Sequence, residues 1–230
     1  MTSPATQPGW YPAPDGSGAP WWWDGSQWVQ PTVGAPMGKP VGRLASAVQV
    51  LLISTVALTL GSIAVDAFGV MAVSAYLDGD FDAADSLVSY DTLAMAVNIP
   101  LFVALLATGV LWVIWQHRLA TRAHGRTRRS PAWHVWSWII PVIAFWFPYQ
   151  NVSDLWRAAG RTRPSWQIAW WLLWIAGGFF GAISSQMGTR AETLDELLVS
   201  MLVGIISSVL TLAAAPFAVR LVRELTQASA

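Results

Sequence analysis

The sequence predicts an all-α membrane protein: four transmembrane helices, a re-entrant or interfacial segment rich in proline and tryptophan, and a small N-terminal tryptophan-rich β-hairpin module. Three observations support this fold class. Hydrophobic residues make up 54% of the 230-residue chain and charged residues only 11%, whereas soluble domains average about 25% charged residues; the mean hydropathy is +0.46. Four apolar runs are long enough to cross a bilayer. The formal net charge of zero hides a separation of cations from acids once the chain is divided at these runs.

The first 30 residues form the predicted N-terminal module, and residues 31–40 a proline-containing linker. Asp-Gly pairs lie among aromatic residues here, which is typical of hairpin turns because glycine accepts a positive φ and cross-strand aromatic pairs add stability. A unit of fewer than about 40 residues buries little apolar area, so it would be marginally stable alone. The candidate recognition residues are aromatic: Trp10, Tyr11, Trp22, Trp23 and Trp28.

The pattern GWYPxPxG…WWDGxxW over residues 9–29 resembles a short tryptophan-rich module of unknown function that occurs at the N-termini of many actinobacterial membrane proteins. Ala13 departs from the pattern, because the family usually has aspartate at that position.

The membrane domain is predicted over residues 41–225, with spans at about 44–65, 92–115, 165–187 and 197–219. The first run has no charged residue over 22 positions, enough to cross a hydrocarbon core of about 30 Å at about 1.5 Å per residue. We expect Asp66 to emerge on the far side, with residues 67–77 as a helical extension on the outer surface, because a carboxylate at the bilayer centre is costly. The alternative places Asp66 within the membrane, where Asp66 and Asn98 would be candidate polar residues at similar depth.

Residues 132–148 are nearly all apolar, but Pro141 and Pro148 interrupt them and three arginines follow within 15 residues. A complete crossing here would export these arginines in a short loop, against the positive-inside rule. We therefore expect a re-entrant or interfacial segment followed by an interfacial helix at 150–160. Trp133 and Arg163 would then lie on the same face of the membrane.

With four spans, one side collects 12 cations and four acids, a balance of +8, and the other collects one cation and nine acids, a balance of −8. The positive-inside rule then predicts a multi-pass protein of the inner (plasma) membrane with both termini in the cytoplasm. The loop between the second and third spans is the most basic part of the chain. Its arginines are predicted to contact anionic lipid headgroups: Arg118, Arg122, Arg126, Arg128 and Arg129.

The candidate membrane-motif residues follow this loop: Trp133, Trp138, Pro141, Pro148, Tyr149, Gln150, Asp154, Trp156 and Arg157. Asp154 and Arg157 are three positions apart, a spacing that allows pairing on one helix face. Tyr149 and Gln150 are expected to hydrogen-bond the irregular backbone of a re-entrant turn. The pattern SPxW…WxxPxxxxxxPYQ…DLW resembles the signature of an actinobacterial membrane-protein family of unknown function, a resemblance that covers most of residues 44–225. It implies a four-helix membrane core and no established activity.

Several function classes lack their usual signatures. The chain has no cysteine and three histidines, and it contains no H-E-x-x-H, G-x-S-x-G or phosphate-binding loop. We expect no enzymatic activity, cofactor, metal site or nucleic-acid partner. The leading hypothesis is a membrane-anchored binding or scaffolding protein whose cytoplasmic module binds a protein or a proline-rich peptide. The alternative is a small transporter or channel that uses the broken segment 133–148. The sequence leaves the oligomeric state open, including a homo-oligomer. The Gly-x-x-x-Gly pattern at Gly177 and Gly181 favours close helix packing within the chain over a contact between two copies.

Overall fold

The computed structural model describes residues 7, 9–16, 20–23, 25–29, 39–123 and 125–229. The chain divides into two compact units, Met1–Lys39 and Pro40–Ala230. The predicted linker falls almost entirely outside the described residues.

In the first unit, three short strands pair antiparallel in the order β1-β2-β3: β1 Gly9–Pro12, β2 Pro20–Trp23 and β3 Trp28–Val29. Gly9 lies opposite Trp23, and Trp23 lies opposite Trp28. The turns use the positive φ that glycine tolerates, 76° at Gly16 and 102° at Gly25. The rings of Trp23 and Trp28 lie 5.1 Å apart between centroids, and Tyr11 meets Trp28 edge-on at 6.2 Å. The side chains of Trp10 and Trp22 lie outside the described part.

Four helices of the second unit are each long and apolar enough to cross a membrane, as predicted. They are α1 Lys39–Leu77, α2 Ala84–Arg122, α5 Trp166–Arg190 and α6 Leu194–Ala228. All four extend beyond the spans predicted from the apolar runs, most of all α1 and α2, which have 39 residues each. Helices of that length measure about 58 Å, nearly twice the hydrocarbon core of a bilayer.

Residues 67–77 are helical, as predicted, and they continue α1 without a break to Leu77. Their position on the outer surface of the membrane stays a prediction. This part of α1 packs along α2. A Cβ built on Gly69 would lie 2.6 Å from the ring of Tyr90, so the glycine makes room for the tyrosine. A charged residue such as Asp66 marks the end of an apolar run in the sequence, but it does not end a helix.

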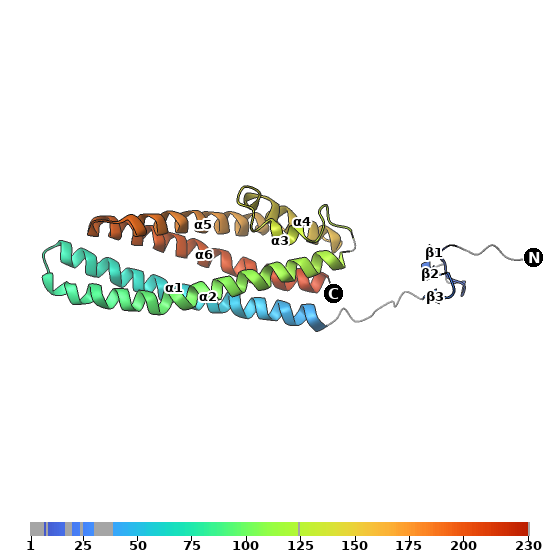
Figure 1. Ribbon diagram of the computed structural model, residues 1–230, viewed down its shortest axis with the longest axis horizontal. Helices are drawn as coiled ribbons and strands as arrows, with labels where there is room; N and C mark the ends of the chain where they lie inside the picture. The colour runs from blue at the N-terminus through green and yellow to red at the C-terminus, as the bar shows by residue number, and fades with distance from the viewer. Residues whose placement is uncertain are drawn as a thin grey trace, which may run out of the picture. The chain divides into compact units, whose positions relative to one another are not determined.

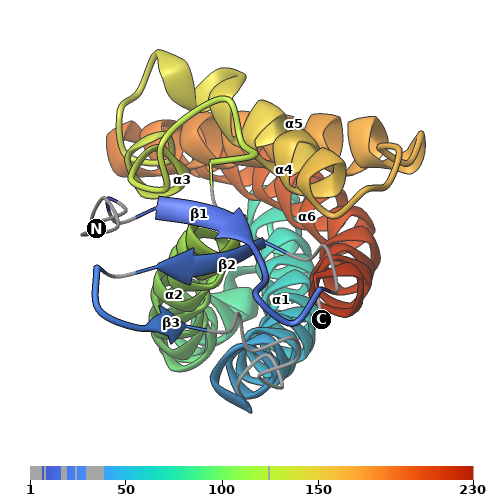
Figure 2. The same ribbon diagram turned by 90° about the vertical axis from the view of Figure 1, so that its right-hand side faces the viewer.

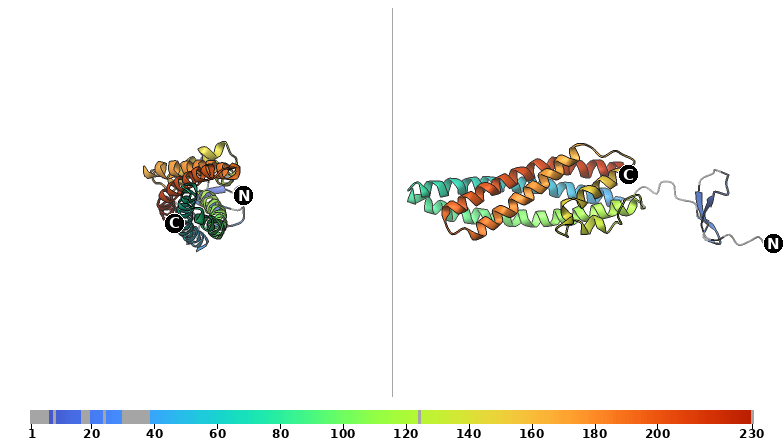
Figure 3. Two further views of the ribbon diagram at one scale, coloured as in Figure 1. Left: turned by 90° about the vertical axis from the view of Figure 1, so that its left-hand side faces the viewer. Right: turned by 90° about the horizontal axis from the view of Figure 1, so that it is seen from above.

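The long helices form two antiparallel hairpins, α1–α2 and α5–α6 (Figure 1). Their short connections, residues 78–83 with the 3₁₀ helix η1 Phe81–Ala83 and residues 191–193, lie together at one end. The opposite end holds the start of α1, the end of α2, the start of α5 and the end of α6, together with residues 123 and 125–165 (Figures 1 and 3). We call it the loop end. Trp133 and Arg163 therefore lie at the same end of the bundle; their place on one face of the membrane stays a prediction.

The α5–α6 hairpin has the closest helix packing in the unit. Its contact is built on small residues: a Cβ on Gly177 would lie 2.8 Å from Thr211 Oγ1, and one on Gly181 would lie 2.9 Å from Ser207 Oγ. Ser207 Oγ also donates a hydrogen bond of 2.8 Å to the Gly177 carbonyl. The Gly-x-x-x-Gly stripe thus faces the neighbouring helix of the same chain.

Two adjacent glycines of α5 give a matched test of this packing. Gly177→Ala places a methyl group against Thr211 and the α6 backbone, so we expect the free energy of unfolding to fall by about 1–3 kcal/mol. Gly178→Ala places its methyl group where no atom lies within 4 Å, so the higher helix propensity of alanine should leave stability unchanged or raise it by up to about 1 kcal/mol. Thermal unfolding of both variants in detergent decides the matter; equal shifts would contradict the packing described.

The loop end carries most of the buried apolar side chains. It contains three short helical segments: α3 Trp133–Trp136, the 3₁₀ helix η2 Ile143–Phe145 and α4 Phe147–Ala158. Pro148 lies in the first turn of α4, where the absent N–H of proline breaks no helical hydrogen bond. Leu155 and Trp156 of α4 pack with Trp115, Leu221 and Leu225 in one buried cluster. The predicted interfacial helix at 150–160 corresponds to α4, which begins three residues earlier.

No helix long enough to cross a bilayer occurs within residues 132–148, all of which the structure describes. Pro141 is exposed, as are four large apolar side chains around it, Ile139, Val142, Phe145 and Trp146. The re-entrant or interfacial placement of this segment in a membrane stays a prediction.

Candidate functional site

Asp154 is the centre of a polar network at the loop end. Its side chain is 1% exposed, whereas those of its two cationic partners, Arg128 and Arg157, are 51% and 55% exposed. Arg128 Nε donates to both carboxylate oxygens, at 2.9 and 3.2 Å. Arg157, one helical turn along α4, donates to Oδ1. Burying a carboxylate is costly unless cations and hydrogen bonds compensate, and these two guanidinium groups supply that compensation for Asp154.

A second set of contacts joins the basic loop to α4. Arg129 donates to Gln150 Oε1 at 2.7 Å and to Asn151 Oδ1 at 3.4 Å, and its guanidinium lies 3.7 Å from the ring centre of Phe147. Asn151 Nδ2 in turn donates to the Trp133 carbonyl at 2.9 Å and to Ser137 Oγ at 3.0 Å. Loop, α3 and α4 are therefore connected through side chains rather than through backbone pairing.

Tyr149 and Gln150 were expected to hydrogen-bond irregular backbone, but their side-chain partners are arginines. Both side chains accept hydrogen bonds from arginine, Tyr149 Oη from Arg163 and Gln150 from Arg129. Asn151 Nδ2 and Trp171 Nε1 instead donate to backbone carbonyls of this segment, those of Trp133 and Phe145. Neither residue was among the candidates from the sequence. Asn151 directly follows the Pro-Tyr-Gln motif, which is the signal that would have indicated it.

Tryptophans pack the network against the long helices. Trp138 Nε1 donates to Gln116 Oε1 of α2 at 3.2 Å. The Trp138 ring meets Trp112, Trp171 and Trp174 edge-on, with centroids 6.0–6.4 Å apart. Such edge-to-face contacts add about 0.5–1.5 kcal/mol each beyond the area they bury. Trp138 thus fixes the broken segment to both hairpins, while Trp133 stays at the surface against Phe147.

The five loop arginines do not share one environment. Arg128 and Arg129 are engaged within the protein by the contacts above. Arg118 and Arg126 are exposed, and Arg126 Nε donates to the Ala123 carbonyl; Arg122 is half-buried and has contacts of its own. Headgroup binding by these arginines stays a prediction, and it applies best to Arg118 and Arg126.

His134 lies fully buried in this network, outside the four long helices. Neither of its ring nitrogens has a partner among the described residues. Burial lowers the pKa of His134 to about 4; Asp154 acts in the opposite direction, and His117 and Arg129 add to the decrease. The imidazole is therefore neutral at physiological pH.

The two candidate polar residues of the first hairpin do not pair with each other. Asp66 accepts a hydrogen bond from Tyr90, and Asn98 Oδ1 accepts one from Ser62 Oγ at 2.9 Å. Tyr90 was missed because it lies 24 positions away in sequence. No group of three histidine, aspartate or glutamate side chains suited to a metal ion occurs in the described part of the chain.

Residues 80–227 match a protein family described as "Domain of unknown function (DUF4328)". The match covers well over half of the chain. The chain belongs to the DUF4328 family. No curated protein and no solved structure was found to match it. The DUF4328 region comprises α2, the connection between α2 and α5, all of α5 and all but the last residue of α6, so it contains the whole Asp154 network. An uncharacterised family agrees with the resemblance stated above, while the specific signature and the N-terminal module stay predictions.

Proposed function

We propose that this DUF4328 protein is a membrane-anchored binding protein. Its four helices hold it in the plasma membrane, and the tryptophan-rich unit, on its proline-containing tether, serves as a recognition module at the cytoplasmic face. The proposal has two parts, the orientation of the helices and the recognition surface, and each has its own support.

The charge distribution along the bundle supports the proposed orientation of the helices in the membrane. The loop end holds 11 of the chain's 12 arginines. The acids at this end, Asp154 and Glu224, are both paired with arginine. The opposite half holds nine acids and Arg190. By the positive-inside rule the loop end, where α1 begins and α6 ends, faces the cytoplasm.

Exposed arginines at the loop end favour contact with anionic lipid headgroups. Each cation near such a surface contributes about 1 kcal/mol of attraction. Arg118 and Arg126 have the exposure that this contact needs. The lipid contact anchors the loop end and leaves the N-terminal unit free for a partner.

The recognition surface is aromatic. Tyr11, Trp23 and Trp28 make ring contacts with one another in the strands of the N-terminal unit. Trp28 is exposed, and Tyr11 and Trp23 are half-buried. Aromatic-lined surfaces accept extended or proline-rich peptides, whose preformed backbone loses little entropy on binding. We propose such a peptide segment of a cytoplasmic protein as the partner.

Affinity capture with the full-length protein, in mild detergent, tests this function. A variant with Trp23→Ala and Trp28→Ala should lose its partners, as should a chain without residues 1–30. Pro14→Ala, in an exposed turn position, is the matched control and should keep them. The same partner list for all four chains would remove the recognition function.

One observation weighs against the transporter alternative. Trp138 and Ile139, which the broken segment contributes to the bundle, line an apolar pocket, whereas ion paths are lined by carbonyl, charged or other polar groups. The geometry therefore favours binding over ion conduction.

A further inference from the structure

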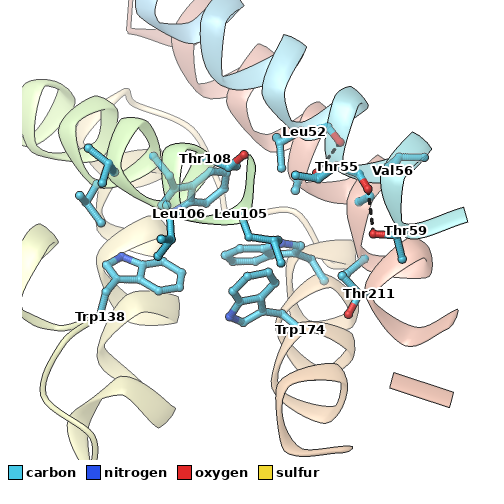
Figure 4. A pocket seen from close by; sticks show the side chains of 18 of the residues that line it. Leu52, Thr55, Val56, Thr59, Leu105, Leu106, Thr108, Trp138, Trp174 and Thr211 are labelled. Carbon is cyan, nitrogen blue, oxygen red and sulfur yellow. Dashed lines mark hydrogen bonds between the residues drawn. The ribbon is translucent and has the colours of Figure 1, made fainter. Parts of the chain in front are cut away.

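A pocket of about 460 Å³ lies between the two helical hairpins. It is within the range of about 300–1,000 Å³ that is usual for small-molecule sites. All four long helices line it, and Trp138 and Ile139 of the broken segment complete its wall. Figure 4 shows Trp138 and Trp174 on one side of it and Thr55, Val56 and Thr59 of α1 on the other. Neither the recognition module nor the Asp154 network uses this pocket.

The wall offers apolar surface almost throughout. Four threonines line the pocket, but each donates its hydroxyl proton to a carbonyl of its own helix, at 2.7–2.9 Å: Thr55, Thr59, Thr108 and Thr211. The remaining lining is aliphatic or aromatic, with four indole rings: Trp112, Trp138, Trp170 and Trp174. A molecule that fills this pocket must therefore be mainly hydrocarbon.

The edge of the pocket faces the lipid side of the bundle. Leu106 and Val110 of α2 and Ile139 of the broken segment line it and are 55%, 55% and 61% exposed. In a membrane-spanning helix, exposed aliphatic side chains contact hydrocarbon rather than water. Entry is therefore from the membrane, where the abundant molecules are lipids with long chains and ester carbonyls.

We propose that this pocket binds one hydrocarbon chain of a membrane phospholipid. The site depends on the membrane placement of the four helices and not on the N-terminal recognition module. Deletion of residues 1–30 leaves the pocket intact. A negative result for lipid binding can therefore be distinguished from a negative result for the recognition function.

Photo-crosslinking tests the site. The full-length protein is placed in phosphatidylglycerol vesicles containing a phospholipid with a diazirine on one acyl chain, and the labelled peptides are identified by mass spectrometry. We expect labelling concentrated on residues 105–113 and 211–218, which line the pocket. Labelling spread evenly over lipid-facing positions such as Phe179 would overturn the proposal, and so would crosslinks between two copies of the protein at the pocket.

Two exposed helical glycines provide a matched pair. Gly109 lines the pocket and Gly178 does not, and a Cβ on either meets no atom within 4 Å. Gly109→Leu fills the pocket and should abolish most labelling of residues 211–218, whereas Gly178→Leu should leave it unchanged. Equal labelling in both well-folded variants would overturn the proposal.

Discussion

Asp154→Asn should lower the free energy of unfolding by about 3 kcal/mol, because it leaves two arginines without their shared carboxylate at a buried position. The value is at the low end for a broken buried pair, since the guanidinium groups of Arg128 and Arg157 are about half exposed and water partly solvates them. For a chain of this length the melting temperature should fall by about 6–12 °C. Thermal unfolding in detergent measures the change.

Glu224→Gln is the control, because Glu224 pairs with Arg220 in a more exposed i, i+4 contact of 2.6 Å. Surface pairs contribute about 0–1 kcal/mol, so this variant should melt within a few degrees of the wild type. If the two variants melt alike, Asp154 does not organise the loop end.

Acid should destabilise the protein through His134. Its pKa is about 4 in the folded chain and 6.5 when unperturbed, so the unfolded chain binds a proton first as the pH falls. The full stability is present above about pH 6.5 and is lost progressively as the pH falls towards 4. Linkage gives a loss of about 2 kcal/mol at pH 5 from this group alone. Unfolding measured at pH 7.5, 6 and 5 follows this loss.

His134→Phe removes the titrating group and the two unpartnered nitrogens, with a ring of similar shape. We expect wild-type stability or better at pH 7.5 and a smaller decrease between pH 7.5 and 5, by about 2 kcal/mol. His117→Phe is the comparison, since His117 is only partly buried, with Nδ1 3.0 Å from the Pro131 carbonyl. An unchanged pH profile in His134→Phe would show that another group causes the acid sensitivity.

Apolar runs and charges were sufficient to predict the four long helices and the common end of Trp133 and Arg163. Both features depend on the local composition of the chain. The positive-inside rule counts the charges of whole loops, so it needs no knowledge of tertiary contacts. The ends of α1 and α2 were not predictable in the same way. Asp66 ends the apolar run of α1, but the helix continues past it to Leu77, and Tyr90 of α2 interacts with the Asp66 carboxylate.

The pairs of residues that contact each other within the loop end could not be predicted from the sequence for a similar reason. The spacing of Asp154 and Arg157 indicates an i, i+3 pair, whereas Arg128 reaches Asp154 from 26 positions away. Likewise the pocket draws its walls from four helices and the broken segment, so no single stretch carries its pattern. Contacts of this kind depend on how the hairpins meet, which periodicity does not encode.

Cysteine accessibility in intact cells tests the central claim most directly, since the natural chain has no cysteine. Ala159→Cys lies at the loop end, after α4, and Ser89→Cys lies near the opposite end, in α2. A membrane-impermeant maleimide added from outside should label Ser89→Cys and should label Ala159→Cys only after the membrane is opened. Labelling of Ala159→Cys from outside would contradict both the cytoplasmic loop end and the return of residues 132–148 to it.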